Sequence, residues 1–136
     1  MPELERALSD DRQWVRQLTA LQILSLKPDH AEAKTVLRNA MRQLEPDLRA
    51  QAASYFWQLT ADINEVLPVI RETLNTAKDE NRQAPLIYAA ELGPLAMPLV
   101  PQIQELLNSQ DASIRQLAGK ALRRIDPKAL PPLNER

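Results

Sequence analysis

Apolar residues recur with a helical period along almost the whole chain. Between residues 29 and 43 they stand three and four positions apart, which places them on one face of an amphipathic helix. These positions are Ala33, Val36, Leu37, Ala40 and Met41. No segment alternates with the period of two that marks a half-buried strand. The pattern therefore predicts an all-α protein.

This pattern repeats every 33 residues without a gap. Six columns of related residues share the one register: Arg16, Arg49, Arg82 and Arg115; Leu8, Met41, Leu74 and Leu107; Thr19, Ala52, Pro85 and Ala118; Ile23, Phe56, Ala89 and Leu122; Leu26, Leu59, Leu92 and Ile125; and Pro28, Ala61, Pro94 and Pro127. Self-similarity at such a period indicates a repeat architecture. We expect four repeats, at about 1–28, 29–61, 62–94 and 95–127, with a tail at 128–136.

Each repeat contains two helical patterns separated by a short polar turn. The first helix is short in the first repeat, at 3–9. In the second and third repeats it begins with a capping-box spacing, Asp29 with Glu32 and Asp62 with Glu65. His30 then falls in the first turn and is expected on the surface. Pro98 can occupy a first turn, whereas Pro68 and Pro101 lie deeper and are expected to kink their helices.

The second helices are expected to bury one apolar face each. The expected core positions are Val15, Leu18, Thr19, Ile23 and Leu26 in the first repeat; Leu48, Ala52, Tyr55, Phe56 and Leu59 in the second; and Ile114, Leu117, Ala118, Ala121, Leu122 and Ile125 in the fourth. In the third repeat Pro85 is tolerated only near a helix start, so this helix should begin near Asn81 or later.

A helix pair with one apolar face on each helix cannot bury its core alone, but stacked pairs share a continuous core. The sequence therefore predicts one domain over residues 1–136, a right-handed α-solenoid of stacked antiparallel helix pairs. Residues 92–127 resemble a HEAT repeat of the variety shared with bilin-lyase-type proteins. The resemblance lies in the Leu-Gly-Pro entry at 92–94, the Ile114-Arg115 pair and the Ala-Leu-x-x-Ile ending at 121–125.

The resemblance covers nearly the whole chain, although the third repeat departs from it with Asn81 before Arg82. It implies an armadillo-like superhelix and an arginine–carboxylate ladder that ties neighbouring repeats together. It says little about activity, because HEAT arrays mostly serve as binding scaffolds. A row of cations for a phosphate backbone is the functional alternative for the arginine column.

Composition excludes several kinds of site. Cysteine is absent and His30 is the single histidine, so thiol chemistry, disulfides and metal sites with two imidazoles are ruled out. The glycines, Gly93 and Gly119, form no phosphate-binding loop. We therefore expect no catalytic, cofactor or metal residues and no enzymatic activity. No signal peptide or membrane span is visible, which favours a cytoplasmic protein without a membrane partner.

Apolar residues also occur on the face opposite the expected core. Leu21, Leu24, Trp57 and Ile87 fall there, on what would be the concave surface of a solenoid. Toward the C-terminus the same columns become basic, at Lys120 and Arg123. We expect these six residues to bind a partner segment. The alternatives are that solenoid curvature buries the apolar members and that the charges form an ordinary solvated face.

The sequence thus predicts a non-enzymatic protein–protein interaction scaffold that binds a partner segment on its concave face. One alternative is an accessory subunit of a bilin-lyase-like system that acts on a tetrapyrrole. A nucleic-acid-binding helical repeat is the weaker alternative, because the formal net charge is −1.

Overall fold

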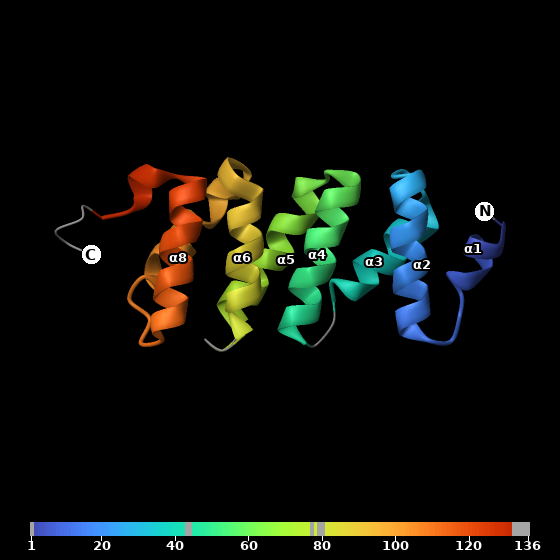
Figure 1. Ribbon diagram of the computed structural model, residues 1–136, viewed down its shortest axis with the longest axis horizontal. Coiled ribbons are helices and arrows are strands. Elements are labelled where there is room, and N and C mark those ends of the chain that lie inside the picture. Colours follow the sequence, from blue (N-terminus) through green and yellow to red (C-terminus); the bar gives the residue numbers. More distant parts are fainter. Residues whose placement is uncertain (1, 43–44, 77, 79–80, 132–136) are drawn as a thin grey trace. The chain divides into compact units, whose positions relative to one another are not determined.

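The computed structural model describes residues 2–42, 45–76, 78 and 81–131, and within these ranges it contains helices and no strands (Figure 1). The α-helices are α1 (Pro2–Ala7), α2 (Gln13–Leu26), α3 (Ala31–Ala40), α4 (Pro46–Thr60), α5 (Ile63–Thr76), α6 (Gln83–Leu92), α7 (Val100–Leu106) and α8 (Ala112–Ile125). The 3₁₀ helices η2 (Gly93–Leu99) and η3 (Pro127–Ala129) flank α7 and α8. The prediction of an all-α protein is confirmed.

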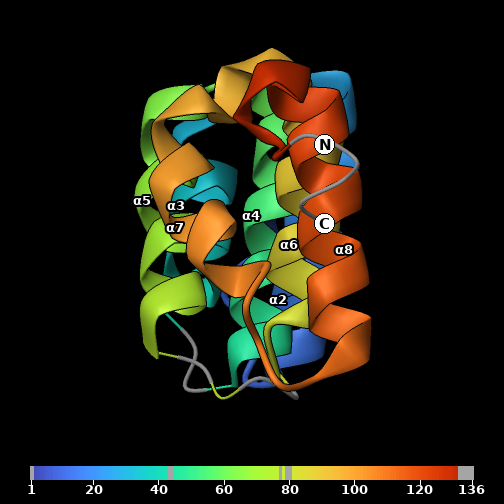
Figure 2. The same cartoon turned by 90° about the vertical axis from the view of Figure 1, so that its left-hand side faces the viewer.

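The chain folds into two compact units, residues 1–66 and 67–136, and α5 passes from one into the other. In the first unit α3 packs against both α2 and α4, and α1 packs against α2 (Figure 1). In the second unit α6 and α8 lie side by side, while α7, η2 and η3 all pack against α8 (Figure 2). Each unit therefore contains a pair of neighbouring helices, α2 with α4 and α6 with α8, and further elements that pack against the pair.

Two of the repeated columns are buried in every repeat. The small-residue column consists of Thr19, Ala52, Pro85 and Ala118, and the apolar column of Ile23, Phe56, Ala89 and Leu122; all eight lie in the core. Small residues on a helix allow a neighbouring helix to approach closely, and the apolar column supplies the buried area that stabilises the pair. The 33-residue register therefore identifies the centre of each buried face.

The expected core of α2 and α4 is partly wrong. Leu18 is 50% exposed and Leu26 is 68% exposed, and Leu48 and Tyr55 are also exposed. Buried in their place are Ala20, Leu24, Ala50 and Ala53. The buried face is rotated by about one residue, roughly 100° around the helix. In α8, by contrast, Ile114, Ala118, Ala121, Leu122 and Ile125 are buried as predicted.

The helix starts differ from the predicted capping boxes. The N-cap of α3 is His30, whose Nδ1 accepts a hydrogen bond from the Ala33 N–H at 3.2 Å. The His30 side chain is only 16% exposed and its Nε2 lies 3.6 Å from Glu5 Oε1, so the expected surface position is wrong. At the start of α5 Glu65 pairs with Arg38 at 2.7 Å. The backbone N–H of Asp62 donates instead to Thr60 Oγ1.

Prolines divide the first helix of the fourth repeat. Pro94 and Pro98 lie in η2, and Pro101 lies in the first turn of α7 rather than deep inside a helix. Proline lacks the backbone N–H and its ring clashes with the carbonyl four residues earlier, so a regular α-helix cannot run through this segment. Pro85 stands two residues after the start of α6, which confirms that this helix begins beyond Asn81. Pro68 lies inside α5 as expected.

Within the described residues one helical run, Gln83–Leu106, is long and apolar enough to cross a membrane by length and composition. It comprises α6, η2 and α7, and it is interrupted at Gly93, where φ is +60°. Leu86, Ala89, Leu99 and Ile103 from this run are completely buried. Core helices of a folded domain pass the same test, so the run is weak evidence for a membrane span.

Candidate partner-binding grooves

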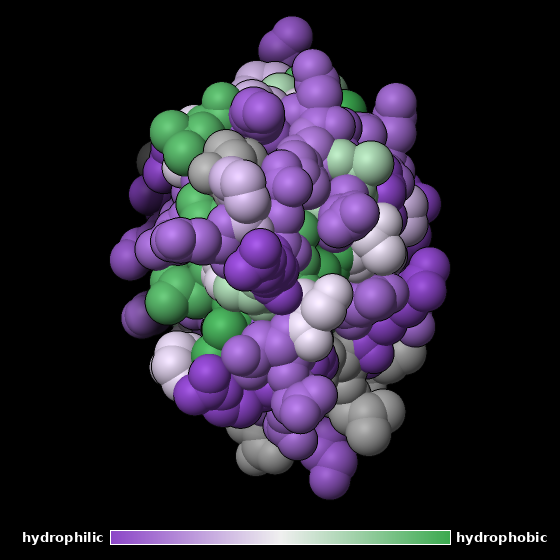
Figure 3. Space-filling model, turned by 90° about the vertical axis from the view of Figure 1, so that its right-hand side faces the viewer, coloured by the Kyte–Doolittle hydropathy of each residue, from purple (hydrophilic) through white to green (hydrophobic). Residues whose placement is uncertain are grey.

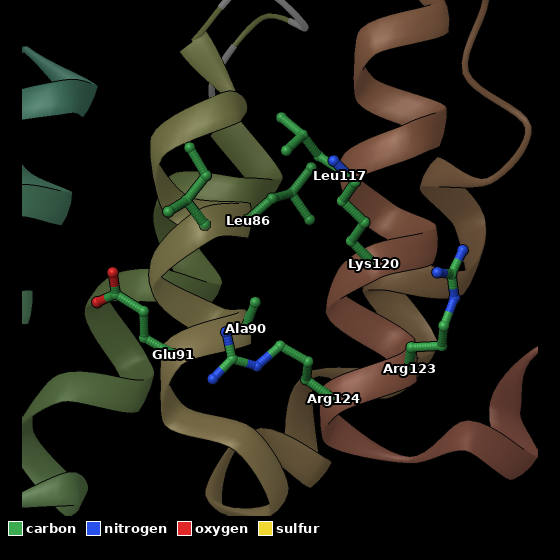
Figure 4. A pocket seen from close by; sticks show the side chains of 8 residues that line it. Leu86, Ala90, Glu91, Leu117, Lys120, Arg123 and Arg124 are labelled. Carbon is green, nitrogen blue, oxygen red and sulfur yellow. The ribbon is translucent and has the colours of Figure 1, made fainter.

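A groove lies between α6 and α8 in the second unit and has a volume of about 410 Å³ (Figure 4). We call it the α6–α8 groove. It is lined by Leu86, Ile87, Ala90 and Glu91 from α6 and by Leu117, Lys120, Arg123 and Arg124 from α8. The groove therefore combines an apolar floor with three cations from one helix.

Helix periodicity explains this lining. The buried face of α8 includes Ala118, Ala121 and Leu122. The adjoining edge of the helix faces α6 and carries Leu117, Lys120 and Arg124. On α6 Leu86 is completely buried, whereas the next residue, Ile87, is 44% exposed. The groove thus has a packed base and an apolar side chain open to solvent.

The cations of the α6–α8 groove are free of partners within the described part of the chain. No residue described there forms a hydrogen bond or ion pair with the side chain of Lys120, Arg123 or Arg124. Figure 4 shows Arg124 extending from α8 toward Ala90 on α6, and Lys120 lying beside Leu117. The carboxylate of Glu91 points away from the groove in the same view. The local field inside the groove is therefore positive.

A second groove, of about 170 Å³, lies in the first unit. We call it the α2–α4 groove. Its lining residues are Trp14, Gln17, Leu18, Leu21, Leu37, Ala40, Leu48, Gln51, Ala52 and Tyr55. Four of them (Trp14, Leu18, Leu48 and Tyr55) are large apolar side chains exposed to solvent, and none of the ten is charged. The face in Figure 3 is largely polar, with apolar groups reaching the surface in separate patches.

The six predicted partner-binding residues have different locations. Leu21 lines the α2–α4 groove, and Ile87, Lys120 and Arg123 line the α6–α8 groove. Leu24 is completely buried, so the prediction that it faces a partner is wrong. It lies on the core face because the buried stripe of α2 is rotated by one residue. Trp57 is half-buried and lines neither groove.

Sequence reasoning missed the main residues of the α2–α4 groove. The sequence pattern predicts Leu18, Leu48 and Tyr55 in the core, and Trp14 is not among the predicted partner-binding residues. The signal that finds them is the pair of fully buried columns. If the buried face of α2 is centred on Thr19, Ala20 and Ile23, Leu18 falls on the solvent-exposed face of the helix.

Three of the four arginines in the repeated column bind backbone carbonyls within their own repeats. Arg16 donates from Nη1 to the carbonyl of Asp10 at 2.6 Å, and Arg115 donates from Nη1 to the carbonyl of Ser109 at 2.7 Å. Arg82 donates from Nε to the carbonyl of Leu74 at 2.9 Å. These bonds tie α2 and α8 to the turn before each of them and tie Arg82 to the last turn of α5, so the expected arginine–carboxylate ladder is wrong at Arg16 and Arg115. Asp79 and Glu80, which the ladder needs in the third repeat, lie outside the described residues.

Among the described residues no group of three or more histidine, aspartate or glutamate side chains lies close enough to share a metal ion.

Comparison with protein-family models, with curated proteins and with solved structures finds no match for this chain. The resemblance to HEAT repeats thus stays a prediction, and the two grooves are the features of the structure that bear on function.

Proposed function

We propose that the chain is a non-enzymatic protein-interaction scaffold, a HEAT-like right-handed α-solenoid that binds a partner segment in its grooves. One observation carries the proposal. Of the eight large apolar side chains exposed in the described residues, five line the two grooves. They are Trp14, Leu18, Leu48, Tyr55 and Ile87. Single exposed apolar residues need no explanation, but a cluster in a hollow is typical of a binding site.

The physical basis is the burial of this apolar area on binding. Each square ångström of apolar surface removed from water contributes about 25 cal/mol, before the ordering of the partner opposes it. Tryptophan and tyrosine are enriched among the residues that dominate binding energy. A segment with apolar side chains spaced as on a helix face fits a hollow between two helices.

The two alternatives have weaker support. Small-ligand sites bury most of their ligand's surface, whereas Ile87 leaves the α6–α8 groove open, which disfavours an enclosed tetrapyrrole. The nucleic-acid reading depended on the arginine column, and three of these arginines are bonded to backbone carbonyls. Protein binding is therefore the better proposal.

A peptide-display selection against the intact chain tests the proposal. Selected peptides, labelled and followed by fluorescence anisotropy, should bind at least tenfold more weakly to Leu18→Asp or Ile87→Asp, since each change places a charge in an apolar hollow. Leu26→Asp and Met97→Asp are matched controls, because both residues are exposed but line neither groove. These controls should bind like the wild type.

The proposal is wrong if selection yields no binder, or if the control variants lose binding as much as the groove variants do. Visible absorbance acquired from added tetrapyrrole, and lost in Ile87→Asp, would support the accessory-subunit alternative. Tight oligonucleotide binding that weakens steeply with salt would support the nucleic-acid alternative.

A further inference from the structure

The two grooves differ in charge, and this difference restricts what the α6–α8 groove can bind. The α2–α4 groove has no charged lining residue, whereas Lys120, Arg123 and Arg124 line the α6–α8 groove, although the Arg123 guanidinium points away from α6 (Figure 4). These cations come from one helix, and no described residue neutralises them. If the occupant of the groove were neutral or basic, the positive charge of these cations would stay uncompensated beside the apolar contacts that the occupant makes.

We infer that the α6–α8 groove binds an amphipathic helix with one acidic edge, an inference that rests on the proposed function. The lining of α8 runs from Leu117 to Arg124 and extends along the axis for about 11 Å, or two helical turns. An occupant helix of that length presents apolar side chains at i, i+3 and i+7 to the floor formed by Leu86, Ile87 and Ala90.

The acidic edge of the occupant lies against Lys120 and Arg124. Figure 4 shows the side chain of Arg124 lying across the groove toward Ala90, where it can meet a carboxylate on a helix seated above the floor. Glu91 is the one acidic lining residue, and its carboxylate points away from the groove. Charges at the rim of an interface mainly set the choice of partner and the association rate.

A protein helix suits this lining better than a nucleic acid does. Single-stranded nucleic acids bind through aromatic platforms on which the bases stack. The lining of the α6–α8 groove contains aliphatic side chains, cations and one carboxylate, and no aromatic ring. The cations therefore serve an acidic peptide whose apolar face provides the remaining contact.

Two labelled 15-residue helical peptides test this inference by fluorescence anisotropy. They share one leucine face and carry either glutamate or lysine along its edges. The glutamate peptide should bind the intact chain about tenfold more tightly at low salt, as expected for two or three exposed charge pairs. The difference should shrink at high salt, where the screening length falls to about 3 Å.

The variant Lys120→Glu/Arg124→Glu should reverse the preference and favour the lysine peptide. Its matched control is Lys27→Glu/Arg42→Glu, which reverses two exposed cations of the first unit that line neither groove. The side chains of Lys120 and Arg124 form no hydrogen bond or ion pair with a described residue, so thermal unfolding should show that the double variant keeps its fold.

The outcomes separate the inference from the proposed function. Equal affinity for both peptides, abolished by Ile87→Asp, overturns the acidic occupant and leaves the proposed function standing. Failure of both peptides, together with failure of the display selection, overturns the inference and the proposed function. Tighter binding of a thymidine oligonucleotide than of the glutamate peptide, lost in the double variant, assigns the cations to nucleic acid and overturns the inference.

Discussion

Ala61 has the backbone conformation that glycine usually provides at the end of a helix. Its φ of 56° and ψ of 23° are left-handed, and it is the C-cap of α4, where its N–H bonds the carbonyl of Trp57 at 2.7 Å. In the other repeats the same column holds Pro28, Pro94 and Pro127. A side chain at a left-handed position crowds the following carbonyl oxygen, so Ala61 is a point of local strain.

Ala61→Gly should raise the free energy of unfolding by about 1 kcal/mol, because glycine adopts this conformation without the clash. Chemical denaturation measures the change. Ala61→Val is the matched comparison and should lower the free energy of unfolding, since a β-branched side chain tolerates positive φ poorly. Equal stability of the three proteins would show that the turn relaxes without strain.

Asp10 is held ionised by its neighbour Arg12. Hydrogen bonds from the Arg12 side chain, at 3.0 and 3.1 Å, and from the Arg12 backbone N–H, at 2.8 Å, lower the pKa of Asp10 from 3.8 to about 2. Because the folded-state pKa is depressed, the resulting stabilisation is present above about pH 4 and is lost as the pH falls toward 2.

Arg12→Ala should therefore raise the pKa of Asp10 part of the way back toward 3.8, since the side-chain hydrogen bonds disappear and the backbone one remains. An NMR titration of the Asp10 carboxylate measures this. Arg42→Ala should leave the Asp10 titration unchanged. An unaltered midpoint in Arg12→Ala would contradict the assigned hydrogen bonds.

At the scale of the element, the amount of charge on a helix decides how well its buried face can be predicted. The outer face of α8 carries Arg115, Lys120, Arg123 and Arg124, so its apolar stripe has a clear edge. By contrast, α2 has leucine or isoleucine at five positions around its circumference. Several faces of α2 then look equally apolar, and only the position of neighbouring helices selects one.

Two leucines on α2 allow a direct test of the corrected face. Leu24→Ala should lower the free energy of unfolding by about 3 kcal/mol, because Leu24 is completely buried and its truncation leaves a cavity. Leu26→Ala, the same change two residues later at an exposed position, should alter it by no more than about 0.5 kcal/mol. Urea denaturation of both variants measures the difference, and the opposite order would restore the sequence-based face.

The first helix of the fourth repeat was less predictable because proline has two compatible outcomes. Pro98 fits the first turn of an α-helix, but it also fits a 3₁₀ segment, where hydrogen bonds span three residues rather than four. The structure places it in η2 and starts α7 at Val100. Spacing alone does not distinguish these outcomes, since both place Ala96 and Leu99 in the core.

At the scale of the whole molecule, the repeat and the compact unit are different divisions of the chain. The sequence repeats every 33 residues, whereas the chain clusters into residues 1–66 and 67–136. The register predicted an all-α chain and the two buried columns, and three of the residues that it assigned to a partner-binding face (Leu21, Ile87 and Lys120) line the grooves. It gave no sign of the compact units, because clustering depends on contacts that a periodic sequence does not specify.

Because the chain divides into two compact units, a cavity should act mainly on the unit that contains it. Leu122→Ala, in α8, should speed amide hydrogen exchange in α6 and α8 by at least about tenfold while changing α2 and α4 much less. Hydrogen exchange followed by mass spectrometry resolves the helices. A uniform acceleration across all four helices would mean that the two units open as one.

The chain has two tryptophans, Trp14 and Trp57, and both belong to the first compact unit. Tryptophan fluorescence therefore reports on the unfolding of residues 1–66, and the second unit contributes no tryptophan signal. Circular dichroism sums the helices of both units. Denaturation curves recorded by the two signals coincide only if the units unfold together. The native chain thus reports on its own cooperativity without an added label.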